Sequence, residues 1–186
     1  LSKEMLYPGS RFRMADELLE EYVRQLIEAH ATVPEVAIAW QGGEPTMMGV
    51  EFFRRATEHV ERYRRPGMTV EYTIQTNGTL IDEHNIDRIA ECDFNYVGVS
   101  LDGIRETHDK FRRMQGAFEK SLQGIRLCRD LGLKIGVRFT MTQDNAHDLP
   151  GLLKLVEDEG IDRFYFSHLN YAGRGNKNRK DDAQYL

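Results

Sequence analysis

Apolar and polar residues follow two different periods along the chain. Short runs that are apolar, or that alternate with polar residues, predict strands over Val36–Trp40, Thr69–Gln75, Asn95–Ser100, Lys134–Thr142 and Arg163–Leu169. Longer stretches with apolar residues at helical spacing predict helices over Met14–His30, Gly49–Tyr63, Asp82–Cys92, Ala117–Gly132 and Leu149–Gly160. Strands that alternate with helices of this length are typical of an α/β fold with a parallel sheet and right-handed crossovers.

Glycine and short polar residues follow four of the predicted strands. These segments are Gly42–Glu44, Thr76–Gly78, Ser100–Gly103 and His168–Asn170. Ligands of parallel sheets bind at the carboxyl ends of the strands. Each segment alone is explained by a turn, because Gly, Asn and Asp favour turns. Four such strand ends together favour one site assembled from several loops.

The segment Trp40–Thr46, "WQGGEPT", has the residues of an amine-binding corner. Two glycines let the backbone approach a ligand closely and leave its carbonyl groups free. A carboxylate beside free carbonyl groups, here Glu44, is a good receptor for an ammonium group. Pro45 can begin the next helix, so the same residues also fit a tight strand-to-helix turn.

Composition narrows the class of protein. The chain has 186 residues, of which 40% are hydrophobic and 30% charged, as expected for one globular domain with a core. A net charge of −5 argues against a long nucleic acid as partner, and no apolar run reaches the roughly 20 residues of a membrane helix. The two cysteines, Cys92 and Cys128, form neither a disulfide scaffold nor a metal motif. We expect a cytoplasmic, reducing compartment.

Three motifs resemble the radical S-adenosylmethionine (SAM) enzymes. They are "GGEP" at Gly42–Pro45, "QTNGTL" at Gln75–Leu80, and "VSLDG....HD..R...GAF" at Val99–Phe118. The first part of the chain, Leu6–Phe53, looks like anaerobic sulfatase-maturating enzymes. The later part looks like the radical SAM enzymes of haem synthesis for nitrite reductase. Either the chain represents a family that lies between these two groups, or it is a chimera of them.

The resemblance implies a partial (βα)6 TIM-like barrel. The five predicted strands would be its second to sixth, without the first strand and without the C-x-x-x-C-x-x-C loop that holds a 4Fe–4S cluster. Residues 1–175 would form the truncated core, and residues 176–186 a polar tail or the start of a linker to a further domain. SAM and a 4Fe–4S cluster are the implied cofactors, and the cluster ligands are absent from this chain.

The same resemblance implies roles for residues at the first strand ends. Gly42, Gly43 and Glu44 would hold the methionine amino group of SAM. Thr76 and Asn77 would line the ribose or substrate side.

Further roles fall on later strand ends. Ser100 would bind the ribose or carboxylate of SAM, and Arg112, or its neighbour Arg113, the methionine carboxylate. Asn170 and Tyr171 would lie near the adenine.

Three other residues have an ordinary alternative. Arg138 points either into the barrel, where SAM or a propionate would supply the anion that its charge needs, or into the helix layer. Asp102 fits a turn, and His108 fits packing within a loop.

The sequence therefore predicts the core of a radical SAM oxidoreductase that is inactive alone. The favoured substrate is a Ser or Cys of a client protein, oxidised to formylglycine, and an electron donor is required. The first alternative is an enzyme that acts on tetrapyrrole propionates. The others are a cluster-free binding module and an unrelated parallel-barrel enzyme. Neither a nucleic acid nor a membrane is an expected partner.

Overall fold

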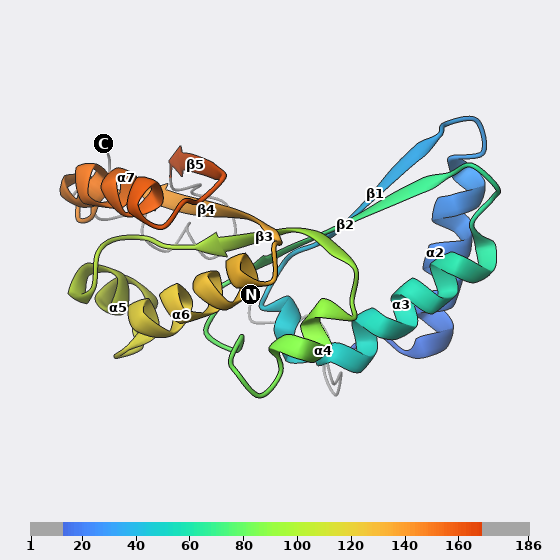
Figure 1. The fold of residues 1–186 in the computed structure, drawn as a ribbon, viewed down its shortest axis with the longest axis horizontal. Helices are drawn as coiled ribbons and strands as arrows, with labels where there is room; N and C mark the ends of the chain where they lie inside the picture. The colour runs from blue at the N-terminus through green and yellow to red at the C-terminus, as the bar shows by residue number, and fades with distance from the viewer. Residues whose placement is uncertain (1–12, 169–186) are drawn as a thin grey trace, which may run out of the picture.

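A computed structural model describes residues 13–168 of the chain (Figure 1). Its sheet has five strands, all parallel, in the order β1-β2-β3-β4-β5. The strands are β1 (Glu35–Trp40), β2 (Thr69–Thr76), β3 (Phe94–Ser100), β4 (Lys134–Met141) and β5 (Arg163–His168). The predicted α/β fold with a parallel, partly closed barrel sheet is confirmed.

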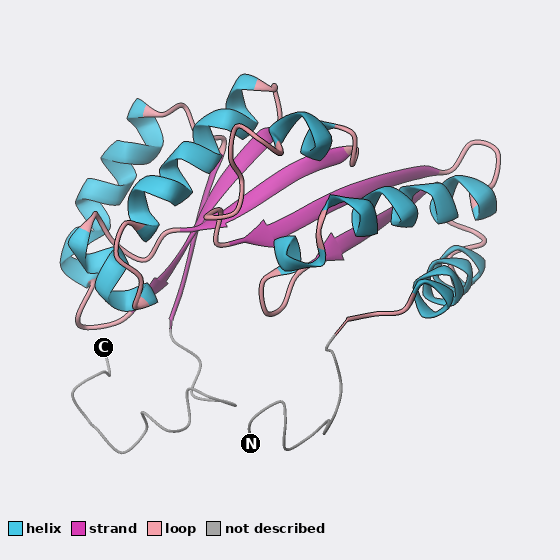
Figure 2. Ribbon diagram, turned by 90° about the horizontal axis from the view of Figure 1, so that it is seen from below, coloured by secondary structure: helices cyan, strands magenta, loops and turns pink. Residues whose placement is uncertain are grey.

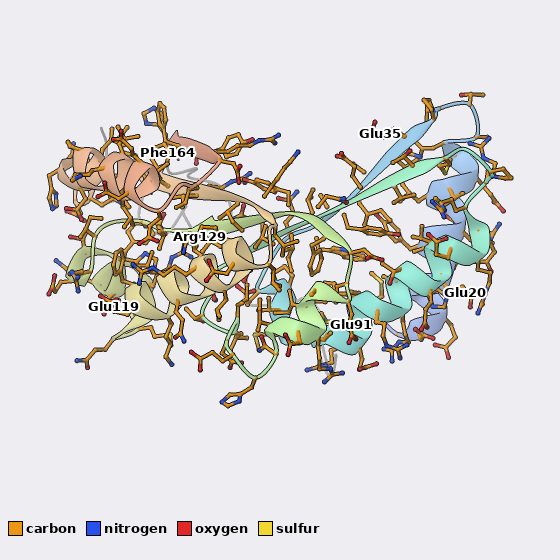
Figure 3. The ribbon with its side chains drawn as sticks, in the orientation of Figure 1. Glu20, Glu35, Glu91, Glu119, Arg129 and Phe164 are labelled. Atoms are coloured by element: carbon orange, nitrogen blue, oxygen red, sulfur yellow. The ribbon has the colours of Figure 1, made fainter. Side chains whose placement is uncertain are left out.

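Helices lie on one face of the curved sheet (Figure 2), and all but the first of them lie between one strand and the next along the chain. They are α2 (Asp16–Ala29), α3 (Val50–Tyr63), α4 (Ile86–Ala90), α5 (Glu106–Arg112), α6 (Ala117–Asp130) and α7 (Leu149–Asp158), with short 3-10 turns η1 (Pro45–Met48) and η2 (Ala146–Asp148). Charged side chains such as Glu20, Glu119 and Arg129 lie on the outer surface of this layer (Figure 3). None of the helices in the described residues is long and apolar enough to cross a membrane.

The two faces of the sheet differ because successive residues of a strand point to opposite sides. Val97 and Val99 of β3 lie opposite Ile135 and Val137 of β4, and all four are at most 1% exposed. These side chains form the core against the helices. The alternate positions, which include Arg138, line the concave face, where no helix of the described residues lies.

Two helices differ from the predicted pattern. The helix predicted over Asp82–Cys92 is only Ile86–Ala90. It is short because the Asn85 side chain accepts from the Asp82 backbone N–H (3.1 Å) and donates to the Leu80 carbonyl (2.7 Å), which closes a turn instead. Helix α5 had no predicted counterpart, and the predicted polar tail, residues 176–186, lies outside the described residues.

Gly124 of α6 sits where a side chain has no room. A Cβ atom there would lie 2.6 Å from the Gly78 carbonyl oxygen, in the loop that follows β2. Close contact at this point also lets Ser121 Oγ donate to the Asn77 carbonyl at 2.6 Å. Helix α6 thus holds the β2 loop in place.

We expect Gly124→Ala to lower the free energy of unfolding by about 2 kcal/mol, because backbone must move to make space. This loss would outweigh the roughly 1 kcal/mol by which Ala favours a helix over Gly. Urea unfolding measures the difference. The matched control is Gly151→Ala in α7, where the nearest atom to a new Cβ is the flexible Ile104 Cγ1 at 3.2 Å. Equal stability of the two variants would contradict the prediction.

Candidate functional site

Glu44 lies at the carboxyl end of β1 and is held by residues of two strand ends. Its Oε1 accepts from the Thr46 backbone N–H (3.1 Å), the Thr46 hydroxyl (2.6 Å) and the Thr76 hydroxyl (2.6 Å). Its Oε2 accepts from the Asn77 backbone N–H at 2.7 Å. Four donors thus fix the position of this carboxylate.

The preceding glycines give this corner its shape. Gly42 and Gly43 have φ values of 99° and 60°, which L side chains rarely adopt. Both residues are exposed, and a Cβ at Gly42 would meet no atom within 4 Å. The backbone before Glu44 is therefore open to a ligand.

A SAM amino group fits this corner. Oε1 of Glu44 already has three donors, whereas Oε2 has one and keeps an acceptor position. The side chain is only partly buried, so a ligand can reach that oxygen. The roles of Gly42, Gly43 and Glu44 stay predictions that this geometry supports.

Thr76 and Asn77 act inside the protein. The Thr76 hydroxyl, 2% exposed, donates to Glu44 and accepts from the Gly78 backbone N–H at 3.0 Å. The Asn77 side-chain oxygen accepts from the Thr79 backbone N–H (2.8 Å) and hydroxyl (2.7 Å). These two residues orient Glu44 and close the β2 loop, and their role beside the ribose or the substrate stays a prediction.

Ser100 lies on the concave face at the end of β3. Gln75 of β2 donates from Nε2 to Ser100 Oγ at 3.1 Å. Its side chain can lie across the sheet because Gly98 leaves room, since a Cβ there would come within 2.3 Å of Gln75 Oε1. Sequence reasoning missed Gln75, although the neighbouring glycine could have indicated a side chain lying flat on the sheet.

The Asp102 carboxyl group is fully buried and lies at the centre of the next loop. Its Oδ1 accepts from the Thr140 backbone N–H at 2.8 Å, and its Oδ2 forms an ion pair with Arg112 Nη2. Burial raises the pKa of Asp102, and Arg112 opposes that shift. The prediction that Asp102 merely makes a turn was incomplete. The Arg112 guanidinium, predicted to bind SAM, already has an internal carboxylate partner.

The residues of the motif "HD..R" lie on helix α5, and their side chains bind the segments on either side of it. His108 is fully buried, and its Nδ1 accepts from the Asp102 backbone N–H at 2.9 Å, while burial lowers its pKa to about 4. Asp109 accepts from the backbone N–H groups of Gly116 (2.5 Å) and Phe118 (2.9 Å), which begin α6. His108 is therefore neutral and holds the strand-end loop, whereas Asp109 fixes the start of α6.

Asn145 is a buried residue that the sequence did not single out. Its Nδ2 donates to the carbonyl oxygens of Asp102 (3.0 Å) and Thr140 (2.9 Å), and its Oδ1 accepts from the Thr142 backbone N–H at 2.7 Å. Asn145 thus joins the ends of β3 and β4. Only the folded chain brings these three partners together.

The structure describes some of the remaining predicted residues. Arg138 lies on the concave face opposite Ser100, which decides between its two predicted directions; it is exposed and not buried. Arg113 follows α5 in the left-handed region, with φ 55°. Asn170 and Tyr171 lie outside the described residues.

The described residues do not fit a 4Fe–4S cluster. No three His, Cys, Asp or Glu side chains between residues 13 and 168 come together to hold a metal ion. Burial raises the pKa of Cys92 to about 11 and that of Cys128 to about 12, so both stay thiols. Both cysteines are buried in the core.

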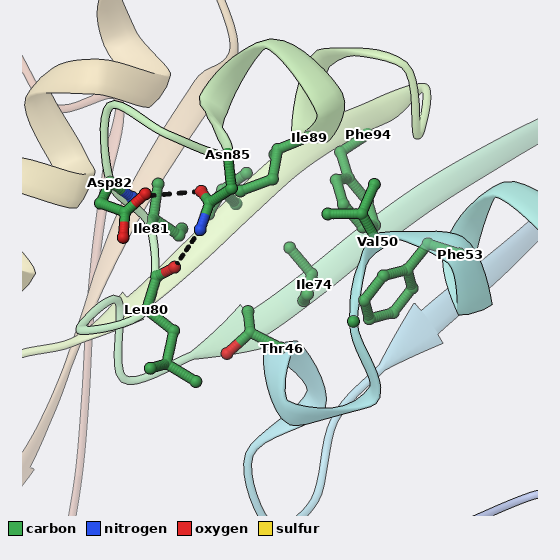
Figure 4. Close-up of a pocket in the computed structure, with 12 residues that line it drawn as sticks. Thr46, Val50, Phe53, Ile74, Leu80, Ile81, Asp82, Asn85, Ile89 and Phe94 are labelled. Carbon is green, nitrogen blue, oxygen red and sulfur yellow. Dashed lines mark hydrogen bonds between the residues drawn. The ribbon is translucent and has the colours of Figure 1, made fainter.

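An apolar cavity of about 290 Å³ lies on the helix side of β2 and β3 (Figure 4). Its walls include Phe53, Ile74, Ile89, Phe94 and Val97. Ile74 and Val97 point away from the concave face, so the cavity and Ser100 lie on opposite sides of the sheet. Thr46, whose hydroxyl donates to Glu44, also lines the cavity.

Comparison with known proteins places this geometry in a family. The profile described as the Radical SAM superfamily matches residues 5–156. The chain is 42% identical to a pre-heme d1 synthase of Dinoroseobacter shibae, over all of this chain and 42% of that protein. It is 44% identical to an Fe-coproporphyrin III synthase of Methanosarcina barkeri, over 90% of this chain and 40% of that protein.

The likeness to sulfatase-maturating enzymes is weaker in sequence. A serine-type anaerobic sulfatase-maturating enzyme of Bacteroides thetaiotaomicron is 35% identical over 78% of this chain and 36% of that protein. The solved structure of native anSMEcpe with bound AdoMet and the Kp18Cys peptide has a TM-score of 0.77 at 27% identity, over 93% of this chain and 47% of that one.

The chain thus spans less than half of the relatives it matches. Family match, sequence relatives and fold agree with the motifs at the strand ends. On these grounds the chain belongs to the radical SAM superfamily.

Proposed function

We propose that the full-length protein is a radical SAM enzyme that acts on the propionate side chains of a tetrapyrrole. The identity pattern supports this proposal: a pre-heme d1 synthase and an Fe-coproporphyrin III synthase are 42% and 44% identical to this chain, against 35% for the sulfatase-maturating enzyme. This ranking reverses the substrate preference drawn from the sequence, which had favoured a client protein.

Family membership implies SAM and a 4Fe–4S cluster as cofactors. In this family SAM supplies a 5′-deoxyadenosyl radical that abstracts hydrogen from the substrate. Glu44 would bind the amino group of SAM through Oε2, and Gly42 and Gly43 would leave the backbone open to it. Ser100 and Gln75 would present polar groups from the adjoining concave face.

The concave face is where a substrate would lie. It carries exposed polar side chains, whereas the helix side is filled by the core. Substrates of barrel enzymes enter from the carboxyl ends of the strands, and Glu44 and Ser100 lie at those ends. A flat, carboxylated ring system would contact Arg138, which projects from this face.

The proposal is tested with the protein made from its complete gene, purified and reconstituted without oxygen. Iron and acid-labile sulfide are first measured to establish that a cluster is present. The reduced protein is then incubated with SAM and either a propionate-bearing porphyrin or a peptide that carries a target Ser or Cys. We expect SAM-dependent mass loss from the porphyrin. A changed peptide beside an unchanged porphyrin would favour the sulfatase-type function instead.

A further inference from the structure

Four side chains of β3, β4 and β5 form a group on the concave face. They are Tyr96, Arg138, Arg163 and Tyr165, here called the arginine–tyrosine group. In the sheet register, Arg163 lies opposite Gly136, and Tyr165 lies opposite Arg138. Because residues two apart share a face, all of these positions face the same side as Ser100, which pairs with Arg138.

Gly136 makes the space in which this group assembles. A Cβ at Gly136 would lie 1.7 Å from the Tyr96 hydroxyl oxygen, so the Tyr96 ring crosses directly over that glycine. The Arg163 guanidinium carbon lies 5.5 Å from the centre of the Tyr96 ring, within range of a cation–π contact. The Tyr96 ring thus reaches from β3 across β4 toward Arg163 of β5.

Within the part of the chain that the structure describes, the guanidinium groups of Arg138 and Arg163 have no carboxylate partner. Among residues 13–168, neither Arg138 nor Arg163 takes part in an ion pair. Many arginines of the helix layer are paired with acidic neighbours, for example Arg24, Arg54, Arg62, Arg126 and Arg129. The concave face is therefore positively charged at this place.

The positive charges of Arg138 and Arg163 both act on the Tyr96 hydroxyl group. Burial raises the pKa of Tyr96, and the nearby Tyr165 adds to this shift, whereas Arg163 and Arg138 both oppose it. Asp162 also acts on Tyr96 and raises its pKa, but one of its oxygens accepts from the Ile135 backbone N–H at 2.7 Å. The phenol is thus neutral and can donate a hydrogen bond.

We propose that the arginine–tyrosine group binds a carboxylate of the substrate, a second anchor beyond the SAM-binding corner at Glu44. The assignment rests on the proposed function, in which the carboxylate is a propionate of a tetrapyrrole. A guanidinium donates two parallel hydrogen bonds to a carboxylate, and the phenol of Tyr96 or Tyr165 can add a third. The aromatic faces of these tyrosines offer a flat surface to the ring system.

Distance from the corner at Glu44 separates this group from the methionine end of SAM. Glu44 follows β1, at one edge of the sheet, whereas Arg163 and Tyr165 belong to β5, at the other edge. Strands β2, β3 and β4 lie between them. The SAM carboxylate is nevertheless a second possible source of the same chemistry, and the experiment has to distinguish the two.

The test uses the reconstituted full-length protein and coproporphyrin III, a tetrapyrrole with propionate side chains. Porphyrin fluorescence gives one dissociation constant, and equilibrium dialysis with labelled SAM gives the other. We expect the double variant Arg138→Gln/Arg163→Gln to bind the porphyrin about tenfold more weakly or worse, the scale of losing charge-assisted hydrogen bonds. Its SAM affinity is expected to stay within about twofold of the parent.

Two further variants make the result specific. Arg24→Gln/Arg54→Gln removes the same charge from the helix layer, where both residues are partly exposed ion-pair partners, and is expected to leave porphyrin binding unchanged. Arg138→Lys/Arg163→Lys keeps the charge but lacks the planar guanidinium group. We expect its porphyrin binding to be weaker than that of the helix-layer control and stronger than that of Arg138→Gln/Arg163→Gln.

Each other outcome has a distinct meaning. Weaker SAM binding with unchanged porphyrin binding would assign the arginines to SAM and overturn the inference. Unchanged porphyrin binding by the glutamine variant would overturn it while leaving the proposed function standing. A parent protein that does not bind the porphyrin would overturn the proposed function and this assignment together.

Discussion

Replacing Arg112 with Ala is expected to lower the free energy of unfolding by about 3 kcal/mol near neutral pH, because the fully buried Asp102 carboxyl group loses its cation. The Asp102 side chain is 0% exposed, and its other oxygen accepts from the Thr140 backbone N–H. The Arg112 side chain is 32% exposed, so we place the loss at the lower end of the range for buried pairs. Urea unfolding of parent and variant measures it.

This loss should depend on pH in a definite direction. Burial already raises the pKa of Asp102, and removal of Arg112, which opposes that shift, raises it further. A group whose pKa is raised on folding stabilises most at pH values below its unfolded pKa, and this contribution disappears as the pH rises through the folded pKa. The deficit of Arg112→Ala should therefore be smaller near pH 5 than near pH 7.

Arg113→Ala is the matched control for this pair. Arg113 is the next residue, is exposed, and forms no ion pair within residues 13–168. We expect its stability to change by less than about 0.5 kcal/mol at either pH. A deficit of Arg112→Ala that stays the same at both pH values would contradict the role given to the Asp102 charge.

Replacing Glu44 with Gln is expected to weaken SAM binding by roughly 10- to 100-fold, the scale of a lost charge-assisted hydrogen bond. Glu44 accepts from four donors, three on Oε1 and one on Oε2. A Gln amide has one acceptor oxygen, so its NH2 group would face either those donors or the SAM ammonium. Either orientation places donor against donor. Equilibrium dialysis of SAM with the full-length protein measures the effect.

Glu35→Gln makes the same chemical change at the opposite end of β1, where Glu35 is exposed (Figure 3). We expect this control to bind SAM like the parent. Thermal unfolding of both variants separates a lost ligand contact from a lost turn, because Glu44 also holds Thr76 and the Asn77 backbone. A folded Glu44→Gln protein with unchanged SAM affinity would remove Glu44 from the binding site.

Much of the fold follows from local pattern. The predicted strands agree with the observed ones within a residue or two, because a buried parallel strand needs a short apolar run whatever surrounds it. Helix α4 is the exception: residues 82–92 have helical spacing, yet the Asn85 side chain bonds backbone groups of Leu80 and Asp82. Asn side chains often bond nearby backbone groups and so compete with the hydrogen bonds of a helix. The spacing of apolar residues gives no sign of such a bond.

Part of the candidate site could also be predicted from the sequence, and part could not. Glycine and a carboxylate after β1 indicated the corner at Glu44, since these residue types have few other uses together. The direction of Arg138 was open, because one residue of register reverses every side chain of a strand. The paired strands place it on the concave face beside Tyr165.

The sequence by itself determined the order of strands and helices, the parallel sheet, the strand ends that carry the site, and the resemblance to the radical SAM enzymes. These properties depend on residue types and spacings within short segments. Only the tertiary structure decided which donors hold Glu44, that Arg112 pairs with Asp102, that Asn145 joins β3 to β4, and that Arg163 reaches Tyr96. Each of these contacts joins residues from separate strand–helix units, and their approach is set by the packing of the whole sheet.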